Sequence, residues 1–159
     1  MHSKILAKQN NIFPWKHEFK FTEPELKEWA YLFSQQMILG DRIFLEGPRG
    51  AGKTTFVRYL LESLQVDQPP QGSPTFAIAH EYTCGLGGVV HIDYDRIRSL
   101  QEIYDAGIYA YYYERPLIII SEWISLWPDF RDHILKTGRI WQCTISFDEE
   151  NRLLKYALS

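Results

Sequence analysis

The residues best suited to chemistry form one short glycine-rich segment, GPRGAGKT at Gly47–Thr54. This segment matches the phosphate-binding pattern G-x-x-x-x-G-K-[ST] at every fixed position. Gly47, Gly50 and Gly52 allow the backbone to bend tightly, so that several N–H groups can point at phosphate oxygens. The pattern therefore predicts a P-loop that binds the phosphates of a nucleoside triphosphate together with Mg²⁺.

The residues at the end of the loop have distinct expected roles. Lys53 is expected to reach the β and γ phosphates, and Thr54 to place its hydroxyl on Mg²⁺. Thr55 lies one step further and is expected to meet the α phosphate. A helix that begins near Lys53 adds unpaired N–H groups and the positive end of its dipole. Arg49 and Ala51 lie inside the loop and complete the residues expected to contact the nucleotide.

Two acids follow β-rich runs and are candidates to complete such a site. Val89–Ile92 leads to Asp93, and Leu117–Ile120 leads through Ser121 to Glu122. A P-loop site also needs a carboxylate near the end of a neighbouring strand, to hold Mg²⁺ or its water. Either acid alone could be a solvated strand end, but two of them favour the functional interpretation.

A threonine between the expected P-loop helix and the next strand is a further candidate. It is Thr75, in the run Ser73–Thr75. In GTPase-like sites a threonine in this region can bind Mg²⁺ and respond to the γ-phosphate. Thr75 could equally begin a strand after a turn, and the residues alone leave both interpretations open.

The surrounding sequence supplies the elements that must position these residues. Arg42–Glu46 is typical of a short buried strand, and Phe56, Leu60 and Leu64 repeat at helical spacing behind the loop. Further strands are expected at His17–Phe21, Thr75–Thr83, Val89–Asp93 and Leu117–Ser121, a closing hairpin at Ile140–Phe147 and Arg152–Leu158, and helices from Thr22 to Gly40 and at Leu100–Ala106. This order indicates one three-layer α/β domain over residues 1–159, with a mixed, mainly parallel sheet flanked by helices. Residues 1–16 are a candidate flexible N-terminal extension.

Composition narrows the classes of protein that fit. The chain has 159 residues, 45% of them hydrophobic, and a net charge of −3, which gives no global basic signature of nucleic-acid binding. Cys84 and Cys143 fit no metal or CxxC spacing. The longest apolar run, Leu117–Ile120, is too short to cross a bilayer, and the first twenty residues lack the apolar core of a signal peptide. We therefore expect a cytoplasmic protein that does not bind membranes.

Taken in order, the motifs resemble those of the TsaE family, also called YjeE. They are GPRGAGKTTF, SPTF at residues 73–76, HID at 91–93 and ISEW at 120–123. Members of this family are small bacterial ATPases needed to make threonylcarbamoyladenosine on tRNA. The resemblance covers Leu26 to Trp123 and implies slow hydrolysis of ATP with Mg²⁺. It also implies two partners, the transferase subunit TsaD and its paralogue TsaB, with tRNA engaged only indirectly.

The resemblance assigns roles to matching positions. Thr54 and Glu122 would be the Mg²⁺ ligands, with Glu122 as the Walker-B-like acid. Asp93 would position the attacking water or the metal, and Thr75 would belong to a nucleotide-responsive switch, so Asp93, Glu122 and Thr75 are the candidate catalytic residues. Trp123 would lie beside the nucleotide, although an ordinary core or interface tryptophan is as good an interpretation.

Several positions depart from the family pattern. Pro48 and Arg49 stand where the family usually has an acidic residue and leucine, Asp95 stands where it has tyrosine, and Ile124 where proline often follows. Arg49 could contact a phosphate or a partner, or be a solvated loop side chain. The Tyr109–Tyr113 stretch could belong to the core or to a partner surface.

Two other functions remain as alternatives. The first is a small-molecule P-loop kinase, for which Arg96, Arg98 and Arg115 are few and scattered. The second is a nucleotide-binding scaffold without catalysis, against which the intact acids argue. Transfer of phosphate to a small alcohol would identify the kinase, and a steady-state ATPase assay would identify the scaffold.

Overall fold

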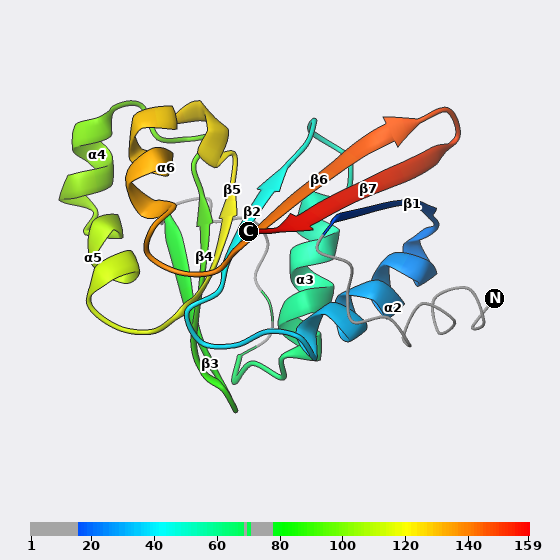
Figure 1. Cartoon of the computed structure of the whole chain (residues 1–159), viewed down its shortest axis with the longest axis horizontal. Helices are drawn as coiled ribbons and strands as arrows, with labels where there is room; N and C mark the ends of the chain where they lie inside the picture. The colour runs from blue at the N-terminus through cyan, green and yellow to red at the C-terminus, as the bar shows by residue number, and fades with distance from the viewer. Residues whose placement is uncertain (1–15, 69, 71–77) are drawn as a thin grey trace.

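The computed structural model describes residues 16–68, 70 and 78–159, which form seven strands and six helices (Figure 1). The strands are β1 (Lys16–Phe21), β2 (Arg42–Glu46), β3 (Ala79–Cys84), β4 (Gly87–Asp93), β5 (Ile118–Glu122), β6 (Ile140–Asp148) and β7 (Asn151–Leu158). The helices are α2 (Glu23–Ser34), α3 (Lys53–Ser63), α4 (Leu100–Asp105), α5 (Ile108–Tyr113), the 3-10 turn η1 (Ile124–Leu126) and α6 (Pro128–Ile134). The expected N-terminal extension up to residue 15 and the candidate Thr75 lie outside the described residues.

All seven strands belong to one sheet, with the order β1-β7-β6-β2-β5-β4-β3. The predicted mixed α/β sheet is confirmed, with parallel pairing confined to its centre. Strands β6, β2, β5 and β4 pair in parallel, whereas β1–β7, β6–β7 and β3–β4 pair antiparallel. The sheet is therefore less parallel than predicted, because β3 and β7 each join their neighbour through a short hairpin turn, which reverses the chain.

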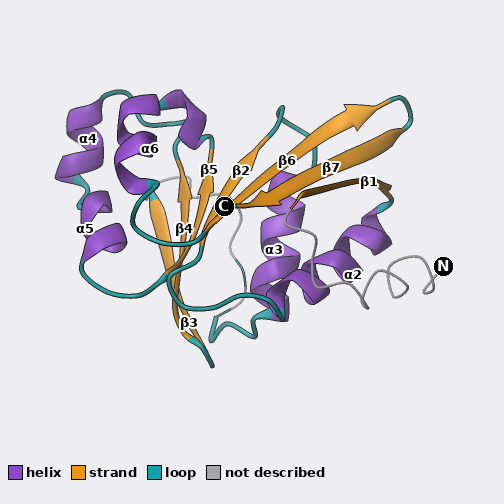
Figure 2. Ribbon diagram, viewed as in Figure 1, coloured by secondary structure: helices purple, strands orange, loops and turns teal. Residues whose placement is uncertain are grey.

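Helices lie on both faces of the sheet (Figure 2), and apolar residues fill the space between the helices and the strands. On one face α2 and α3 pack Trp29, Phe33 and Phe56 against the odd-numbered residues of β2. On the other face α4, α5 and α6 pack against Phe44 and the neighbouring strands. Successive residues of a strand point to opposite faces, so a strand covered on both sides reads as a continuous apolar run. This is why β2 and β5 were recognisable in the sequence.

Helix α2 is shorter than the sequence indicated. Its start at Thr22 is confirmed, since the Thr22 backbone N–H donates to the Glu25 carboxylate at 2.7 Å. The helix ends at Ser34, before the expected stop at Gly40. Met37 lies beyond the end of the helix but is still buried. Its spacing from Phe33 therefore matched the helical pattern although the residue is not helical.

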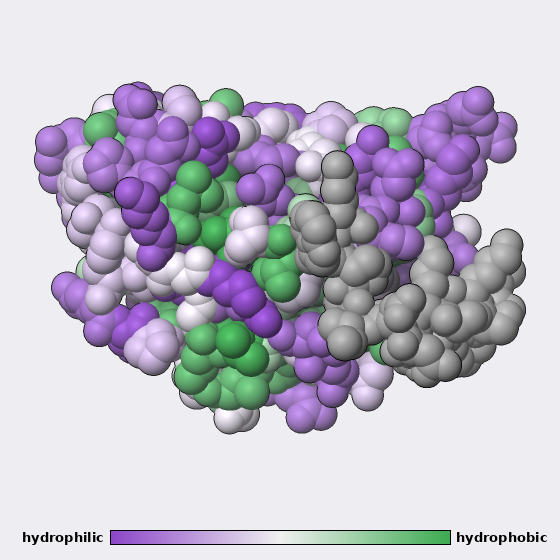
Figure 3. All heavy atoms as spheres, in the orientation of Figure 1, coloured by the Kyte–Doolittle hydropathy of each residue, from purple (hydrophilic) through white to green (hydrophobic). Residues whose placement is uncertain are grey.

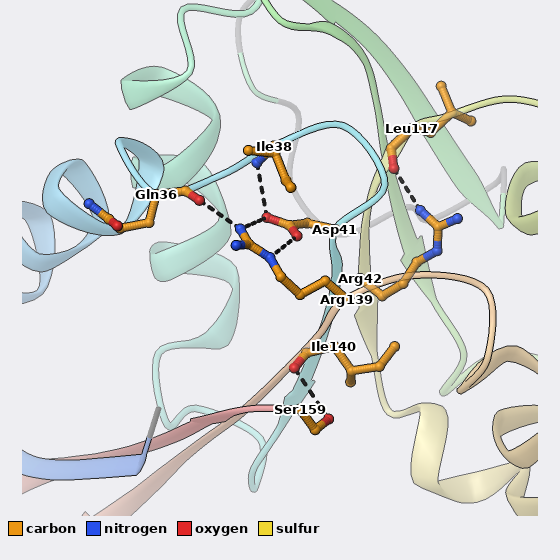
Figure 4. Close-up of polar contacts among 8 residues, drawn as sticks. All are labelled: Gln36, Ile38, Asp41, Arg42, Leu117, Arg139, Ile140 and Ser159. Atoms are coloured by element: carbon orange, nitrogen blue, oxygen red, sulfur yellow. Dashed lines mark hydrogen bonds and ion pairs between the residues drawn. The ribbon is translucent and has the colours of Figure 1, made fainter. Parts of the chain in front are cut away.

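A polar cluster fixes the beginning of the central strands (Figure 4). Arg139 donates to the buried Asp41 carboxylate with Nε at 2.7 Å and Nη2 at 2.8 Å, and Asp41 also accepts the Ile38 N–H at 3.0 Å. Arg42 donates from Nη1 to the Leu117 carbonyl oxygen at 2.6 Å. These bonds tie the starts of β2, β5 and β6 together, so that their carboxyl ends meet at the opposite edge of the sheet.

An apolar patch lies low on the face drawn in Figure 3, over the turn between β3 and β4. Leu86 in this turn is exposed, and so are Ile38 and Leu39 in the loop before β2. Leu39 lies next to Gly87, which joins the two segments into one patch. None of the helices that the structure describes is long and apolar enough to cross a membrane.

Candidate functional site

The glycine-rich loop lies between β2 and α3, as the sequence predicted. Gly47, Gly50 and Gly52 have positive φ angles of 142°, 76° and 112°, which other residues rarely adopt. A Cβ atom on Gly47 would lie 2.0 Å from the carbonyl oxygen of Ile145, so β6 runs directly against the start of the loop. The glycines therefore give the loop the backbone shape that a phosphate cradle requires, while phosphate binding itself stays a prediction.

Lys53 begins α3 and turns its side chain back over the loop. Its Nζ donates to the carbonyl oxygens of Gly47 at 2.6 Å and Pro48 at 3.0 Å. Burial lowers the pKa of Lys53, and the nearby charges of Glu122 and Asp93 oppose this shift. Because both hydrogen-bond acceptors are neutral, the positive charge of the ammonium remains available to an anion.

The two predicted acids lie beside each other at the carboxyl edge of the sheet. Asp93 of β4 is the register partner of Glu122 of β5, and Glu122 lies opposite Leu45 of β2. Both side chains are buried, at 7% and 2% exposure. Burial raises the pKa of Asp93, and the charge of Glu122 adds to the rise, although the Asp95 N–H donates to Asp93 Oδ1 at 3.0 Å and opposes it.

His91 is a polar residue of this site to which sequence reasoning gave no role of its own. It lies in β4, completely buried, and its Nε2 is 2.7 Å from Glu122 Oε1. Its Nδ1 has no hydrogen-bond partner within the described part of the chain. Beside it on β3 is His80, whose pKa is lowered by burial. The available signal was a histidine inside an apolar run, two residues before a candidate acid.

The remaining predicted site residues differ in their burial and in their contact with Lys53. Trp123, with a left-handed φ of 62°, places its ring centroid 4.3 Å from Lys53 Nζ, a cation–π contact. Ala51 is buried beneath the loop, whereas Thr54 is exposed and Thr55 half-buried. Lys53, Asp93, Glu122 and Trp123 are thus brought together.

Arg49 and Asp95, two of the positions that depart from the family pattern, contact each other. The exposed Arg49 guanidinium forms an ion pair with the half-buried Asp95 carboxylate. The pair bridges the glycine-rich loop and the end of β4. The Arg49 side chain nevertheless stays 80% exposed, so the ion pair leaves it largely solvated.

The oxygen-bearing side chains of this site suit Mg²⁺, which needs few protein ligands, better than a metal ion whose ligands all come from the protein. The described residues contain no group of three or more His, Cys, Asp or Glu side chains arranged to hold a metal ion. Mg²⁺ commonly takes one or two carboxylates and completes its shell with phosphate oxygens and water. The Thr54 hydroxyl, next to Lys53 in the sequence, and the Glu122 carboxylate, one oxygen of which lies 2.7 Å from His91 Nε2, are oxygen donors of this kind.

Comparison with known proteins gives one consistent family. The family model described as threonylcarbamoyl adenosine biosynthesis protein TsaE matches residues 21–153. The TsaE protein of Rickettsia typhi is 34% identical over 108 residues, which cover 66% of this chain and 72% of that protein. The TsaE protein of Aquifex aeolicus is 38% identical over 94 residues, which cover 55% and 71%. The crystal structure of YdiB from Bacillus subtilis has the same fold, with a TM-score of 0.66 at 24% identity, covering 91% of this chain and 86% of YdiB.

Proposed function

Because this chain belongs to the TsaE family, we propose that it is the ATP-binding and slowly hydrolysing subunit of the machinery that makes threonylcarbamoyladenosine on bacterial tRNA. One observation carries the proposal. The glycine-rich loop, Lys53 and two buried acids meet at the carboxyl edge of the sheet, where α/β proteins bind ligands.

Each residue of the site then has a proposed task in binding. Lys53 moves its ammonium from the loop carbonyls to the β and γ phosphates, and the N–H groups of Gly50, Gly52 and the start of α3 donate to phosphate oxygens. Thr54 and Glu122 would hold Mg²⁺, which when bound neutralises charge on the phosphates. Trp123 covers one side of Lys53, which keeps water away from its charge.

Hydrolysis requires a water molecule aligned with the γ-phosphate. We assign its orientation to Asp93, because Asp93 is fixed by the Asp95 N–H and lies beside Glu122. Phosphoryl transfer leaves little covalent chemistry for the protein, so positioning and charge supply most of the effect. Thr75 is proposed as the switch residue that reports the γ-phosphate.

The family also suggests the setting in which the chain works. We propose TsaD-like and TsaB-like proteins as partners, with tRNA contacted only through them, since a net charge of −3 gives little attraction for a polyanion. We further propose that the chain is one P-loop domain and that it acts in the cytoplasm.

Binding of ATP with Mg²⁺ by a Lys53→Ala variant tests the proposal. We expect the dissociation constant to rise on the order of ten-fold or more, because a charge-assisted hydrogen bond to phosphate is lost. Lys136→Ala, at an exposed lysine after α6, is the matched control and should bind like the wild type. Calorimetry that finds the same affinity in all three proteins would remove Lys53 and the loop from nucleotide binding.

A further inference from the structure

An exposed aromatic side chain lies beside the glycine-rich loop, on the side away from the acids. Phe147, near the end of β6, is 50% exposed. A Cβ atom on Gly50 would lie 4.0 Å from Phe147 Cζ, so the ring edge borders the loop backbone. Single exposed hydrophobic side chains are common on protein surfaces, so the significance of this ring comes from its place against the glycine-rich loop.

A guanidinium group accompanies this ring. Arg152 of β7 is the register partner of Phe147, and its guanidinium carbon lies 4.3 Å from the ring centroid. The backbone places the pair firmly, since β6 continues along β2 in parallel up to Glu46 and Thr144 and then passes the loop at Ile145. The hairpin is also held from β1, where Lys20 Nζ lies 2.7 Å from Asp148 Oδ2. Arg152 thus lies over one face of the Phe147 ring and brings a positive charge beside it.

The strand order indicates which part of a bound nucleotide would lie nearest to this pair of side chains. Asp93 and Glu122 lie on β4 and β5, on one side of β2, whereas Phe147 and Arg152 lie on β6 and β7, on the other. If the acids and Mg²⁺ hold the γ end of a triphosphate, the α phosphate and the nucleoside must leave the loop on the opposite side. That side is the one bordered by Phe147.

We propose that Phe147 and Arg152 form a stacking platform for the base of the nucleotide whose phosphates the loop binds. The inference rests on the proposed function, because it takes its direction from the triphosphate in the loop. Stacking on an aromatic ring tolerates every base, and the guanidinium over the other side of the stack adds a cation–π contact. The platform therefore supplies affinity for the nucleoside part and little selection among bases.

Binding of two ligands to the full chain separates the platform from the loop. Mg·ATP carries a base, and Mg·tripolyphosphate carries the same phosphates without one. In the wild type we expect ATP to bind more tightly than tripolyphosphate. Phe147→Ala should weaken ATP on the order of ten-fold, from the usual strength of base stacking, and leave tripolyphosphate within about two-fold. Phe147→Tyr should restore ATP binding, and Arg152→Met should weaken ATP but not tripolyphosphate.

The control is Tyr104→Ala, because Tyr104 is equally exposed at 49% and lies on α4, at the far end of the molecule from the hairpin (Figure 1). It should change neither affinity, and melting temperatures should show that all variants are folded. Unchanged ATP affinity in folded Phe147→Ala would overturn the platform, and so would parallel loss of both ligands, which would mean an effect on the loop. A wild type that binds neither ligand would instead refute the proposed function.

Discussion

At the scale of single residues, Gly47 tolerates the least change. Its φ of 142° lies outside the range of other residues, and the carbonyl oxygen of Ile145 occupies the place of any Cβ atom. Gly52 also has a positive φ, but no heavy atom lies within 4 Å of its Cβ position. A substitution at Gly52 therefore introduces backbone strain alone, whereas a substitution at Gly47 introduces strain and a steric clash.

We expect Gly47→Ala to destabilise the chain more than Gly52→Ala. The strain of an unfavourable φ costs about 1–3 kcal/mol in either variant, whereas only alanine at position 47 must also push β6 away from the loop. Denaturant unfolding of both variants measures the difference. Equal free energies of unfolding would mean that the loop and β6 move apart easily.

The charged Asp93 carboxylate is expected to lower the stability of the fold at neutral pH while it supports hydrolysis. Burial raises its pKa, so the folded chain binds the proton more tightly than the unfolded chain does. This contribution to stability is fully present below the unfolded pKa of about 3.9 and is lost as the pH rises through the raised folded pKa. At neutral pH the charged carboxylate, repelled by Glu122 and Asp95, therefore costs stability.

Asp93→Asn should accordingly unfold at a higher denaturant concentration than the wild type at pH 7, and the gain should shrink towards pH 4. The same variant should hydrolyse ATP on the order of ten-fold more slowly, with little change in affinity, because water positioning matters mainly in the transition state. Asp132→Asn, at an exposed aspartate on α6, is the control and should leave both turnover and stability at pH 7 nearly unchanged. Normal turnover in folded Asp93→Asn would exclude Asp93 from the mechanism.

The site was predictable where chemistry fixes residue types at fixed spacing. The loop, Lys53 and the two strand-end acids were read from the sequence, and the structure brings them together. The Arg49–Asp95 ion pair and the His91–Glu122 pair were not, because each joins residues from different strands or loops. The position of Phe147 beside the loop was not predictable either, because it depends on how β6 runs against Gly47 and Gly50.

At the scale of elements, the strands and helices α2, α3 and α4 were predictable, whereas helices α5 and α6 were not. β2, β4, β5 and the β6–β7 hairpin lie within a few residues of their expected positions. β2, β4 and β5 are buried on both faces and leave apolar runs, whereas β6 and β7 largely alternate buried and more exposed residues on either side of a turn. Helices α5 and α6 span two turns or fewer, too few residues for a helical period to appear. Tyr109–Tyr113 proved divided, with Tyr112 in the core and Tyr109 and Tyr113 exposed.

The ion pair at the starts of β2 and β6 should contribute strongly to stability. Asp41 is fully buried, so Asp41→Ala leaves the Arg139 guanidinium without its carboxylate. We expect a loss of about 2 kcal/mol, less than for a fully buried pair because Arg139 is about one-third exposed. Asp132→Ala breaks the exposed pair with Arg131 and should cost no more than about 1 kcal/mol. Similar losses in thermal unfolding would contradict the role given to burial.

At the scale of the whole molecule, one sheet carries both apolar clusters. Ile43 and Leu45 of β2 belong to the cluster under α2 and α3, and Phe44 between them belongs to the other. If the central strands unfold, the apolar residues of both clusters become exposed to water. This shared sheet supports the proposal of one domain.

Equilibrium unfolding should therefore be a single cooperative transition. Trp29 and Trp141 lie in one cluster, and Trp123 and Trp127 pack against the other, so tryptophan fluorescence reports both. Its transition in urea should coincide with the loss of secondary structure followed by circular dichroism. Two separated transitions would show that the clusters unfold independently and would divide the proposed domain.

The pairing of β1 with β7 determines when, during synthesis of the chain, this edge of the sheet can form. Lys16 pairs with Ala157 and Phe21 with Arg152, and β7 is the neighbour that the sheet order gives β1. On the ribosome β1 emerges first, yet it must wait with its backbone unpaired until β7 has been translated. Pairings between segments so distant in sequence form slowly, and a waiting strand can join the wrong chain. This edge of the sheet therefore forms only after β7 has been translated, and a chain that stalls before β7 keeps β1 unpaired.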